Sequence, residues 1–146
     1  MTCKEDRLIH TLGTSTRSAE EFLNLLAVHG VELIIDVRRF PTSRYEHFGQ
    51  EKLKGLLSDN GVEYIHMGRE LGGYRQGGYQ NFTKTPGFQR RLKKLEDVAN
   101  NRRAAIICAE LLPWRCHRRF IAQELGKRGW QVNHIIDRDR NWSPGQ

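Results

Sequence analysis

Short runs of apolar residues alternate along this chain with longer segments in which apolar residues recur every three or four positions. The short runs are typical of strands buried on both faces, and the longer segments are typical of helices with one apolar face. Strands that alternate with helices pair in parallel through right-handed crossovers, so we expect one sheet covered by helices on both sides. The predicted strands are Leu8–Gly13, Glu32–Val37, Val62–His66, Ala104–Cys108 and Gln131–Ile136.

This alternation predicts the α/β class and a single three-layer α/β/α domain over residues 1–146. The domain would be Rossmann-like or rhodanese-like, with a mostly parallel five-stranded sheet in the order 3-2-1-4-5. In such a sheet the loops after the first and fourth strands flank the crevice where ligands bind. The polar ends of the chain, 1–6 and 138–146, are expected to fray.

Capping signals delimit the predicted helices. Ser18 with Glu21 makes a capping box, and Thr85 is a good N-cap because Pro86 follows it at the first helical position. These signals and the apolar spacing predict helices near 18–30, 53–61, 85–98 and 116–128. A long glycine-rich loop is left over residues 68–85, and loops of that length inside a compact domain are usually functional or disordered.

Composition narrows the class of protein. The chain is 38% hydrophobic and 28% charged, as in ordinary globular proteins. No run approaches the roughly 18 apolar residues that span a bilayer, and the first residues lack the apolar core of a signal peptide. We therefore expect a cytoplasmic protein without a membrane partner. Its three cysteines are too few for a disulfide framework, which favours thiols, metal ligands or redox groups.

The positive charge is carried mainly by arginine. The formal net charge is +7, with 17 arginines against 7 lysines, and the guanidinium group suits phosphate and carboxylate recognition. Strand-to-helix loops of a parallel sheet meet at one edge, so we expect an anionic small molecule or a nucleic acid among the arginines of these loops. The arginines predicted to share this edge are Arg17, Arg38, Arg39, Arg44, Arg69, Arg75, Arg115, Arg118 and Arg119.

The densest chemistry follows the fourth predicted strand, in the segment from Cys108 to Arg118. Cys116 and His117 open a helix there, where the helix dipole and nearby arginines favour a thiolate. The predicted catalytic residues are Cys108, Glu110, Cys116 and His117.

Three functional interpretations of this segment stay open beside a structural one. In the first, Cys108 or Cys116 is a nucleophile and His117 or Glu110 moves protons. In the second, Cys108, Cys116 and His117 bind zinc or iron, with Glu110 and with His66 or His134 from another strand, although the paired spacing of zinc sites is missing. In the third, the two thiols form a reversible disulfide. The structural interpretation treats Cys108 as a small buried hydrophobic residue.

The distance from Cys108 to Arg115 is one residue longer than the loop of cysteine phosphatases and lacks its glycines, which counts against that chemistry.

Other loops supply candidate ligand contacts. Residues 13–18 could cradle a phosphate at a helix N-terminus, although an ordinary capped turn is the simpler interpretation. No phosphate-loop or nicotinamide fingerprint is present, and the cofactor stays unknown. Asp36 could act as a base, but we favour its pairing with Arg38. The predicted ligand-binding residues are Thr14, Ser15, Arg17, Asp36, Arg38, Arg69, Tyr74, Arg115 and Arg118.

Five blocks of sequence stand out along the chain: Thr11–Arg17, Leu33–Arg38 with Pro41 and Ser43, Gly68–Gly73, Cys108-Ala-Glu110 with Cys116-His117-Arg118, and Val132–Ile135. Together these blocks resemble the domain of unknown function 488 family, and the resemblance runs through nearly the whole chain. The resemblance implies a small bacterial or archaeal α/β domain whose blocks form a common site, and it implies no activity.

The leading hypothesis is an enzyme whose site lies at the carboxyl ends of the strands and acts on an anionic, phosphorylated or nucleotide-like ligand. The alternative is a nucleic-acid-binding module without catalysis, in which Tyr74 and Tyr79 would stack on bases. A weaker alternative is a thiol redox or metal-binding adaptor.

Overall fold

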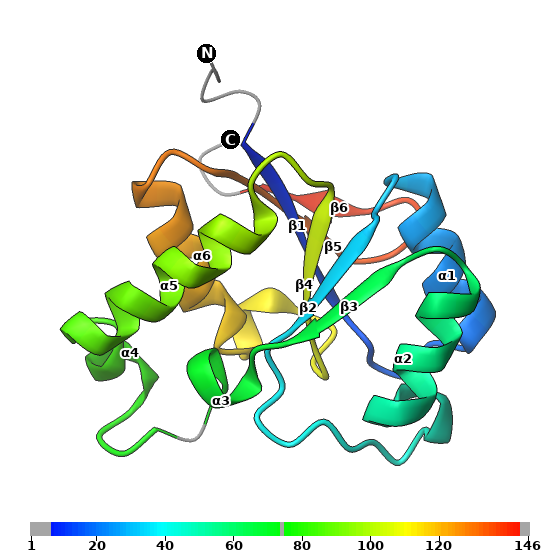
Figure 1. Ribbon diagram of the computed structural model, residues 1–146, viewed down its shortest axis with the longest axis horizontal. Coiled ribbons are helices and arrows are strands. Elements are labelled where there is room, and N and C mark those ends of the chain that lie inside the picture. The colour runs from blue at the N-terminus through cyan, green and yellow to red at the C-terminus, as the bar shows by residue number, and fades with distance from the viewer. Residues whose placement is uncertain (1–6, 74, 144–146) are drawn as a thin grey trace.

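The computed structural model describes residues 7–73 and 75–143 and shows one six-stranded sheet with helices on both faces (Figure 1). The sheet order is β3-β2-β4-β1-β5-β6, and every neighbouring pair is parallel except β5 and β6. The α/β class and the mostly parallel sheet are thus confirmed. The strands are β1 (Leu8–Gly13), β2 (Leu33–Asp36), β3 (Glu63–His66), β4 (Ala104–Cys108), β5 (Gln131–Ile135) and β6 (Asn141–Trp142).

The predicted strand order 3-2-1-4-5 is wrong, because β4 lies between β2 and β1. All five side chains of β4 are buried, as a strand with neighbours on both edges requires. The order depends on which helix faces pack on which side of the sheet, and apolar periodicity does not carry that information. The loops after β1 and β4 still lie side by side at one edge, since β1 and β4 pair in register up to their last residues, Gly13 and Cys108.

Two apolar cores, one on each face, hold the helices to the sheet (Figure 1). Alternate side chains of β4 point to opposite faces: Ile106 packs in the core under α5 and α6, and Ile107 packs in the core under α1 and α2. The longer helices are α1 (Ala19–Val28), α2 (Gln50–Asp59), α5 (Pro86–Ala99) and α6 (Arg118–Lys127).

The capping predictions are confirmed. The Ser18 side chain accepts from the backbone of Glu21 and the Glu21 carboxylate accepts from the backbone of Ser18, so the capping box is complete. Thr85 accepts from the backbone of Phe88 at the start of α5. These caps satisfy backbone N–H groups that have no partner inside the first turn of a helix.

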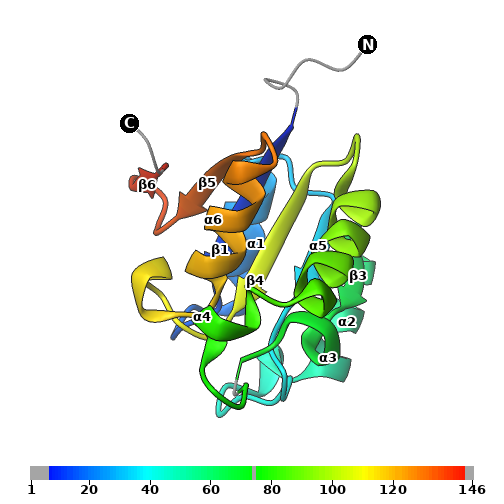
Figure 2. The ribbon, with the colours of Figure 1, turned by 90° about the vertical axis from the view of Figure 1, so that its left-hand side faces the viewer.

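Two segments are more ordered than the sequence indicated. The predicted loop 68–85 contains the one-turn helices α3 (Gly68–Leu71) and α4 (Tyr79–Phe82), which are too short to show a helical period (Figure 2). Within 138–146, which was expected to fray, β6 pairs with β5 after a turn closed by bonds from Ile136 and Asp137 to the carbonyl of Arg140. Residues 1–6 and 144–146, the other predicted frayed segments, lie outside the described residues.

Two short 3₁₀ helices, η2 (Glu46–Phe48) and η3 (Pro113–Arg115), lie in the loops after β2 and β4. Among the described residues no helix is long and apolar enough to cross a bilayer.

Glycines allow the loops at the carboxyl edge to approach the strands closely. A Cβ atom on Gly13 would lie 1.8 Å from the carbonyl oxygen of Glu110, and one on Gly68 would lie 2.0 Å from that of Arg38. Both contacts involve backbone, which cannot move without shifting a loop. The loop after β4 is therefore pressed against the end of β1.

Replacing Gly13 with alanine should lower the free energy of unfolding by about 3 kcal/mol, because the added methyl group overlaps the Glu110 carbonyl. The matched control is Gly55→Ala in α2, where no atom lies within 4 Å of the new methyl group. That control should gain about 1 kcal/mol from helix propensity. Urea denaturation of both variants measures the difference, and equal stabilities would show that the loop after β4 is not fixed as described.

Candidate functional site

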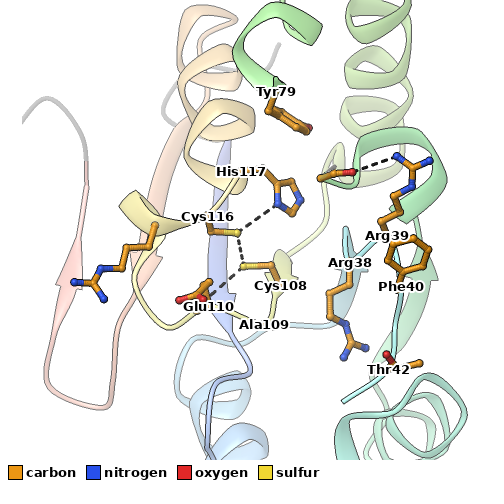
Figure 3. A pocket seen from close by; sticks show the side chains of 12 residues that line it. Arg38, Arg39, Phe40, Thr42, Tyr79, Cys108, Ala109, Glu110, Cys116 and His117 are labelled. Carbon is orange, nitrogen blue, oxygen red and sulfur yellow. Dashed lines mark hydrogen bonds between the residues drawn. The ribbon is translucent and has the colours of Figure 1, made fainter. Parts of the chain in front are cut away.

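A pocket of about 650 Å³ opens at the carboxyl edge of the sheet, between the loops that follow β2 and β4 (Figure 3). The β2 loop leads to α2 on one face and the β4 loop leads to α6 on the other, so a crevice forms where they diverge. The pocket is lined by Arg38, Arg39, Phe40, Thr42, Gly73, Tyr79, Cys108, Ala109, Glu110, Arg115, Cys116 and His117.

The two thiols of the β4 loop meet in this pocket. Cys108 is the last residue of β4, Cys116 follows η3, and their Sγ atoms lie 2.7 Å apart. The backbone N–H of Arg118, in the first turn of α6, lies 3.5 Å from Cys116 Sγ. Cys116 therefore receives two donors, one from a thiol and one from a helix N-terminus, as a thiolate requires.

The two thiols differ in acidity. The hydrogen bond from Cys108 is the largest influence on Cys116 and lowers its pKa, and the hydrogen bond and charge of His117 lower it further against the effect of burial. Burial, followed by the hydrogen bond to Cys116, raises the pKa of Cys108. One proton shared by the pair thus resides on Cys108, and the negative charge resides on Cys116.

His117 lies between the thiol pair and the backbone of the β2 loop. Its Nε2 is 3.2 Å from the carbonyl oxygen of Val37 and its Nδ1 is 3.6 Å from Cys116 Sγ. Because a carbonyl can only accept, Nε2 carries a proton and Nδ1 faces the sulfur. The ring of Tyr79 packs against the imidazole with centroids 5.2 Å apart. His117 is thus oriented to take a proton from Cys116 or to return one.

Glu110 contributes to the site through its backbone as well as its side chain. Its carbonyl oxygen accepts from Arg118 at 2.8 Å and lies 3.8 Å from Cys108 Sγ. The residue is exposed and lines the pocket. The predicted catalytic residues Cys108, Glu110, Cys116 and His117 are therefore brought together in one pocket.

Arg118 is entirely buried and bonds to the protein itself. Its Nη1 donates to the hydroxyl of Thr11 at 3.1 Å, and its Nη2 donates to the carbonyls of Glu110 and Leu111, both at 2.8 Å. The guanidinium group thereby fastens the β4 loop to β1. Its prediction as a ligand-binding residue stays a prediction, and its visible contacts are structural.

Arg38 and Arg17 also point their donors at protein groups. Arg38 forms an ion pair with Asp36 at 2.8 Å and donates to the carbonyl of Phe48 at 2.7 Å, so the pairing that we favoured for Asp36 is observed. Arg17 donates to the carbonyls of Gly13 and Ile136.

The loop after β1 does not line the thiol pocket. The backbone N–H groups of Thr14 and Ser15, predicted to cradle a phosphate, donate to the carbonyls of Cys108 and Ala109 at 2.8 and 2.9 Å. Ser15 and Arg17 instead line a smaller pocket of about 180 Å³ beside Asp137. The backbone of this loop supports the end of β4.

The remaining predicted residues are dispersed. Arg69 is exposed on α3 and Tyr74 lies outside the described residues. His66 contacts the carbonyl of Arg38 and His134 contacts the hydroxyl of Thr11. Over residues 7–73 and 75–143 no group of three or more histidine, cysteine or acidic side chains is arranged to hold a metal ion.

The structure adds pocket residues that the sequence did not single out as ligand contacts. Phe40 and Thr42 follow β2, and Arg39 counted only among the arginines of this edge. Their position directly after a buried strand was the available signal. Both Arg38 and Arg39 line the pocket, but Arg38 is buried and paired with Asp36, whereas Arg39 is exposed. Sequence alone does not separate these two neighbouring arginines.

The chain belongs to the family described as Domain of unknown function DUF488, whose model matches residues 18–125. This confirms the resemblance seen in the sequence. The match includes the blocks after β2, β3 and β4 and leaves out those at 11–17 and 132–135. A comparison with curated proteins finds no match.

Replacing Arg118 with methionine should lower the free energy of unfolding by about 3 kcal/mol, because Thr11 and two loop carbonyls lose a charged donor. Arg119→Met is the matched control, because Arg119 is the next residue in the chain and its side chain is exposed. The control should change stability by about 0.5 kcal/mol or less. Chemical denaturation distinguishes the two, and a loss in Arg118→Met no larger than in the control would contradict the fastening role.

Two buried histidines should limit stability in acid. Burial lowers the pKa of His10 to about 4, helped by the charge of His29, and burial lowers that of His134 to about 4, helped by Arg118. The ordinary histidine pKa is about 6.5, so below that pH the unfolded chain binds more protons than the folded one. The contribution of the two neutral histidines to the free energy of unfolding is complete above pH 6.5 and is lost as the pH falls toward 4.

We therefore expect the free energy of unfolding to fall by about 2 kcal/mol or more per histidine over this range. Denaturation curves between pH 7 and pH 4 measure the slope. The double variant His10→Gln/His134→Gln should have a shallower slope whatever its absolute stability, and an unchanged slope would refute this origin.

Proposed function

We propose that this protein is a thiol-dependent enzyme in which the Cys116 thiolate attacks an electrophilic atom of a small anionic substrate. The observation that carries the proposal is the hydrogen-bonded chain from Cys108 through Cys116 to His117 on the wall of the pocket (Figure 3). An activated cysteine nucleophile needs a lowered pKa and an adjacent base, and both are supplied here.

The roles of the three side chains follow from their contacts. Cys108 and the backbone N–H of Arg118 stabilise the negative charge on Cys116 before a substrate arrives. His117, held by the carbonyl of Val37, accepts the Cys116 proton and can return it to a leaving group. The fixed carbonyl partner keeps the imidazole nitrogen that faces the sulfur from rotating away.

The pocket suits a small anion better than a polymer. Its volume of about 650 Å³ falls in the range typical of small-molecule sites. Arg39 and Arg115 line it, and Phe40 and Tyr79 add apolar surface beside them. Of the predicted anion-binding arginines, Arg115 is the one that is exposed in this pocket.

Nucleic-acid binding without catalysis is a second candidate function, supported by a different surface. Trp114 and Trp142 are 49% and 46% exposed and meet edge to face with centroids 6.0 Å apart. Arg119 donates to the backbone carbonyl of Trp114, which places positive charge in the same loop as one of these rings. Tyr79 supports this candidate less, because it packs against Phe82, Phe88 and Phe120.

Alkylation by iodoacetamide tests the nucleophile directly, in a Cys3→Ser background that leaves two thiols. Cys116 should react as a thiolate, with an apparent pKa well below the ordinary thiol value of about 8.5, while Cys108 should be spared. Rates measured from pH 4 to pH 9, with peptide mapping of the label, give both results.

Variants identify the cause of the reactivity. His117→Gln should raise the apparent pKa of Cys116, whereas Glu110→Gln, which removes an exposed carboxylate of the same pocket, should leave it nearly unchanged. A Cys116 that titrates like a free thiol, or equal labelling of both cysteines, would remove the proposed function. Salt-dependent binding of single-stranded DNA lost in Trp114→Ala would favour the second candidate instead.

A further inference from the structure

We propose that the pocket reduces small anionic disulfides by thiol–disulfide exchange, with Cys116 as the attacking thiol and Cys108 as the resolving thiol. This inference rests on the proposed function, and it adds the substrate class and the second thiol's role. Cys116 lines the pocket and is half-buried, whereas Cys108 lies behind it with only 2% of its surface exposed.

The burial of Cys108 decides which thiol does which step. Cys108 borders the pocket, but its side chain belongs to the core under α5 and α6, together with Ile106 and Ile121, so its sulfur is far less accessible to a bulky substrate than that of Cys116. The sulfur within its reach is that of Cys116, at 2.7 Å. Cys108 can therefore attack a group already bonded to Cys116.

The placement of a second thiol at this distance favours a sulfur-bonded intermediate. Attack by a thiol on a disulfide sulfur releases the other sulfur as a thiolate, which is ordinary exchange chemistry. An acyl or phosphoryl group on Cys116 would instead only move to Cys108, deeper in the core, where water cannot release it. The geometry thus suits an adduct in which Cys116 forms a disulfide with half of the substrate.

The steps balance as follows. The Cys116 thiolate attacks one sulfur of the substrate R–S–S–R, a protein–substrate disulfide forms, and the first R–S⁻ leaves and takes up the proton that His117 accepted from Cys116. Cys108 then loses its proton and attacks Cys116 Sγ, the Cys108–Cys116 disulfide forms, and the second R–S⁻ leaves with that proton. The substrate gains two electrons and the protein loses two. An external dithiol reductant returns the pair to the reduced state.

During these steps, protons move between the two cysteines and His117. Once Cys116 is bonded to the substrate it no longer carries a negative charge, so the hydrogen bond and the charge of Cys116 cease to raise the pKa of Cys108, although burial, the largest cause, still raises it. His117 Nδ1, 3.6 Å from Cys116 Sγ, lies close enough to receive a proton and to pass it to the departing thiolate.

The preference for an anion, and for a substrate larger than a peroxide, follows from the pocket. Arg39 and Arg115 line a space of about 650 Å³ together with Phe40 and Thr42. A carboxylate-bearing disulfide fills such a space and contacts the guanidinium groups. Hydrogen peroxide is too small to fill the pocket and carries no negative charge for the arginines to bind.

The test uses reduced protein with Cys3→Ser and glutathione disulfide as the anionic probe, followed by mass spectrometry and release of glutathione. The Cys3→Ser protein should release both halves of the probe and end with an internal disulfide. Cys108→Ala should release one half and stop with the other half bonded to Cys116, and Cys108→Ser repeats this with a side chain closer in size. Cys116→Ser should release neither half.

Charge preference is measured with cystamine, a cationic disulfide, beside the anionic probe. The anionic probe should react about tenfold faster or more, and Arg115→Gln should reduce that ratio. Arg90→Gln is the matched control, because Arg90 is exposed on α5 and does not line the pocket. An unchanged ratio in Arg115→Gln would overturn the anionic substrate class.

Two results separate this inference from the proposed function. If Cys108→Ala releases both halves of the probe, or if a low-pKa Cys116 does not react with the probe, the exchange reaction is overturned while the nucleophile stands. If Cys116 lacks thiolate reactivity toward iodoacetamide, both fail together. Circular dichroism of each variant confirms that a lost reaction is not lost folding.

Discussion

The buried guanidinium group of Arg118 is the contact on which the geometry of the site depends. It joins three separate parts of the chain: the hydroxyl of Thr11 in β1, the carbonyls of Glu110 and Leu111 in the β4 loop, and the first turn of α6, where Arg118 itself lies. A charge buried to this extent is costly unless its donors are bonded, and hydrogen bonds from a charged group contribute about 1.5–3 kcal/mol each. The same residue fixes the loop with its side chain and offers its backbone N–H to Cys116.

This fastening explains why two cysteines eight positions apart in the sequence share a proton. The intervening loop must turn back so that Cys116 returns to the end of β4, and the Arg118 side chain holds the two carbonyls at the point where it turns. Gly13 allows the turn to lie against β1, because a larger residue would overlap the Glu110 carbonyl. The acidity of Cys116 is thus a consequence of loop packing as much as of local charge.

Apolar periodicity and capping signals predicted the strands and helices well, because buried runs such as Ala104–Cys108 and caps such as Ser18 are local features. The cysteine, histidine and glutamate candidates were concentrated after one strand and lie in one pocket, and their catalytic role stays a prediction. What the sequence could not provide was non-local: the place of β4 between β2 and β1, and the two short helices within residues 68–85. Both depend on tertiary packing, which no local pattern encodes.

The arginines are a second case in which a local sequence pattern did not predict the contacts of the side chains. A count of positive charges at one edge predicted an anion to offset their repulsion, yet Arg17, Arg38 and Arg118 direct donors to carbonyl oxygens or to Asp36. Carbonyl groups at strand ends lack a ladder partner, and a guanidinium fork can satisfy several of them at once. Arginines in such loops therefore divide into those that hold the loops and those that face the pocket, and burial separates the two. By that criterion Arg39 and Arg115, both exposed and both lining the pocket, are the residues that face a substrate.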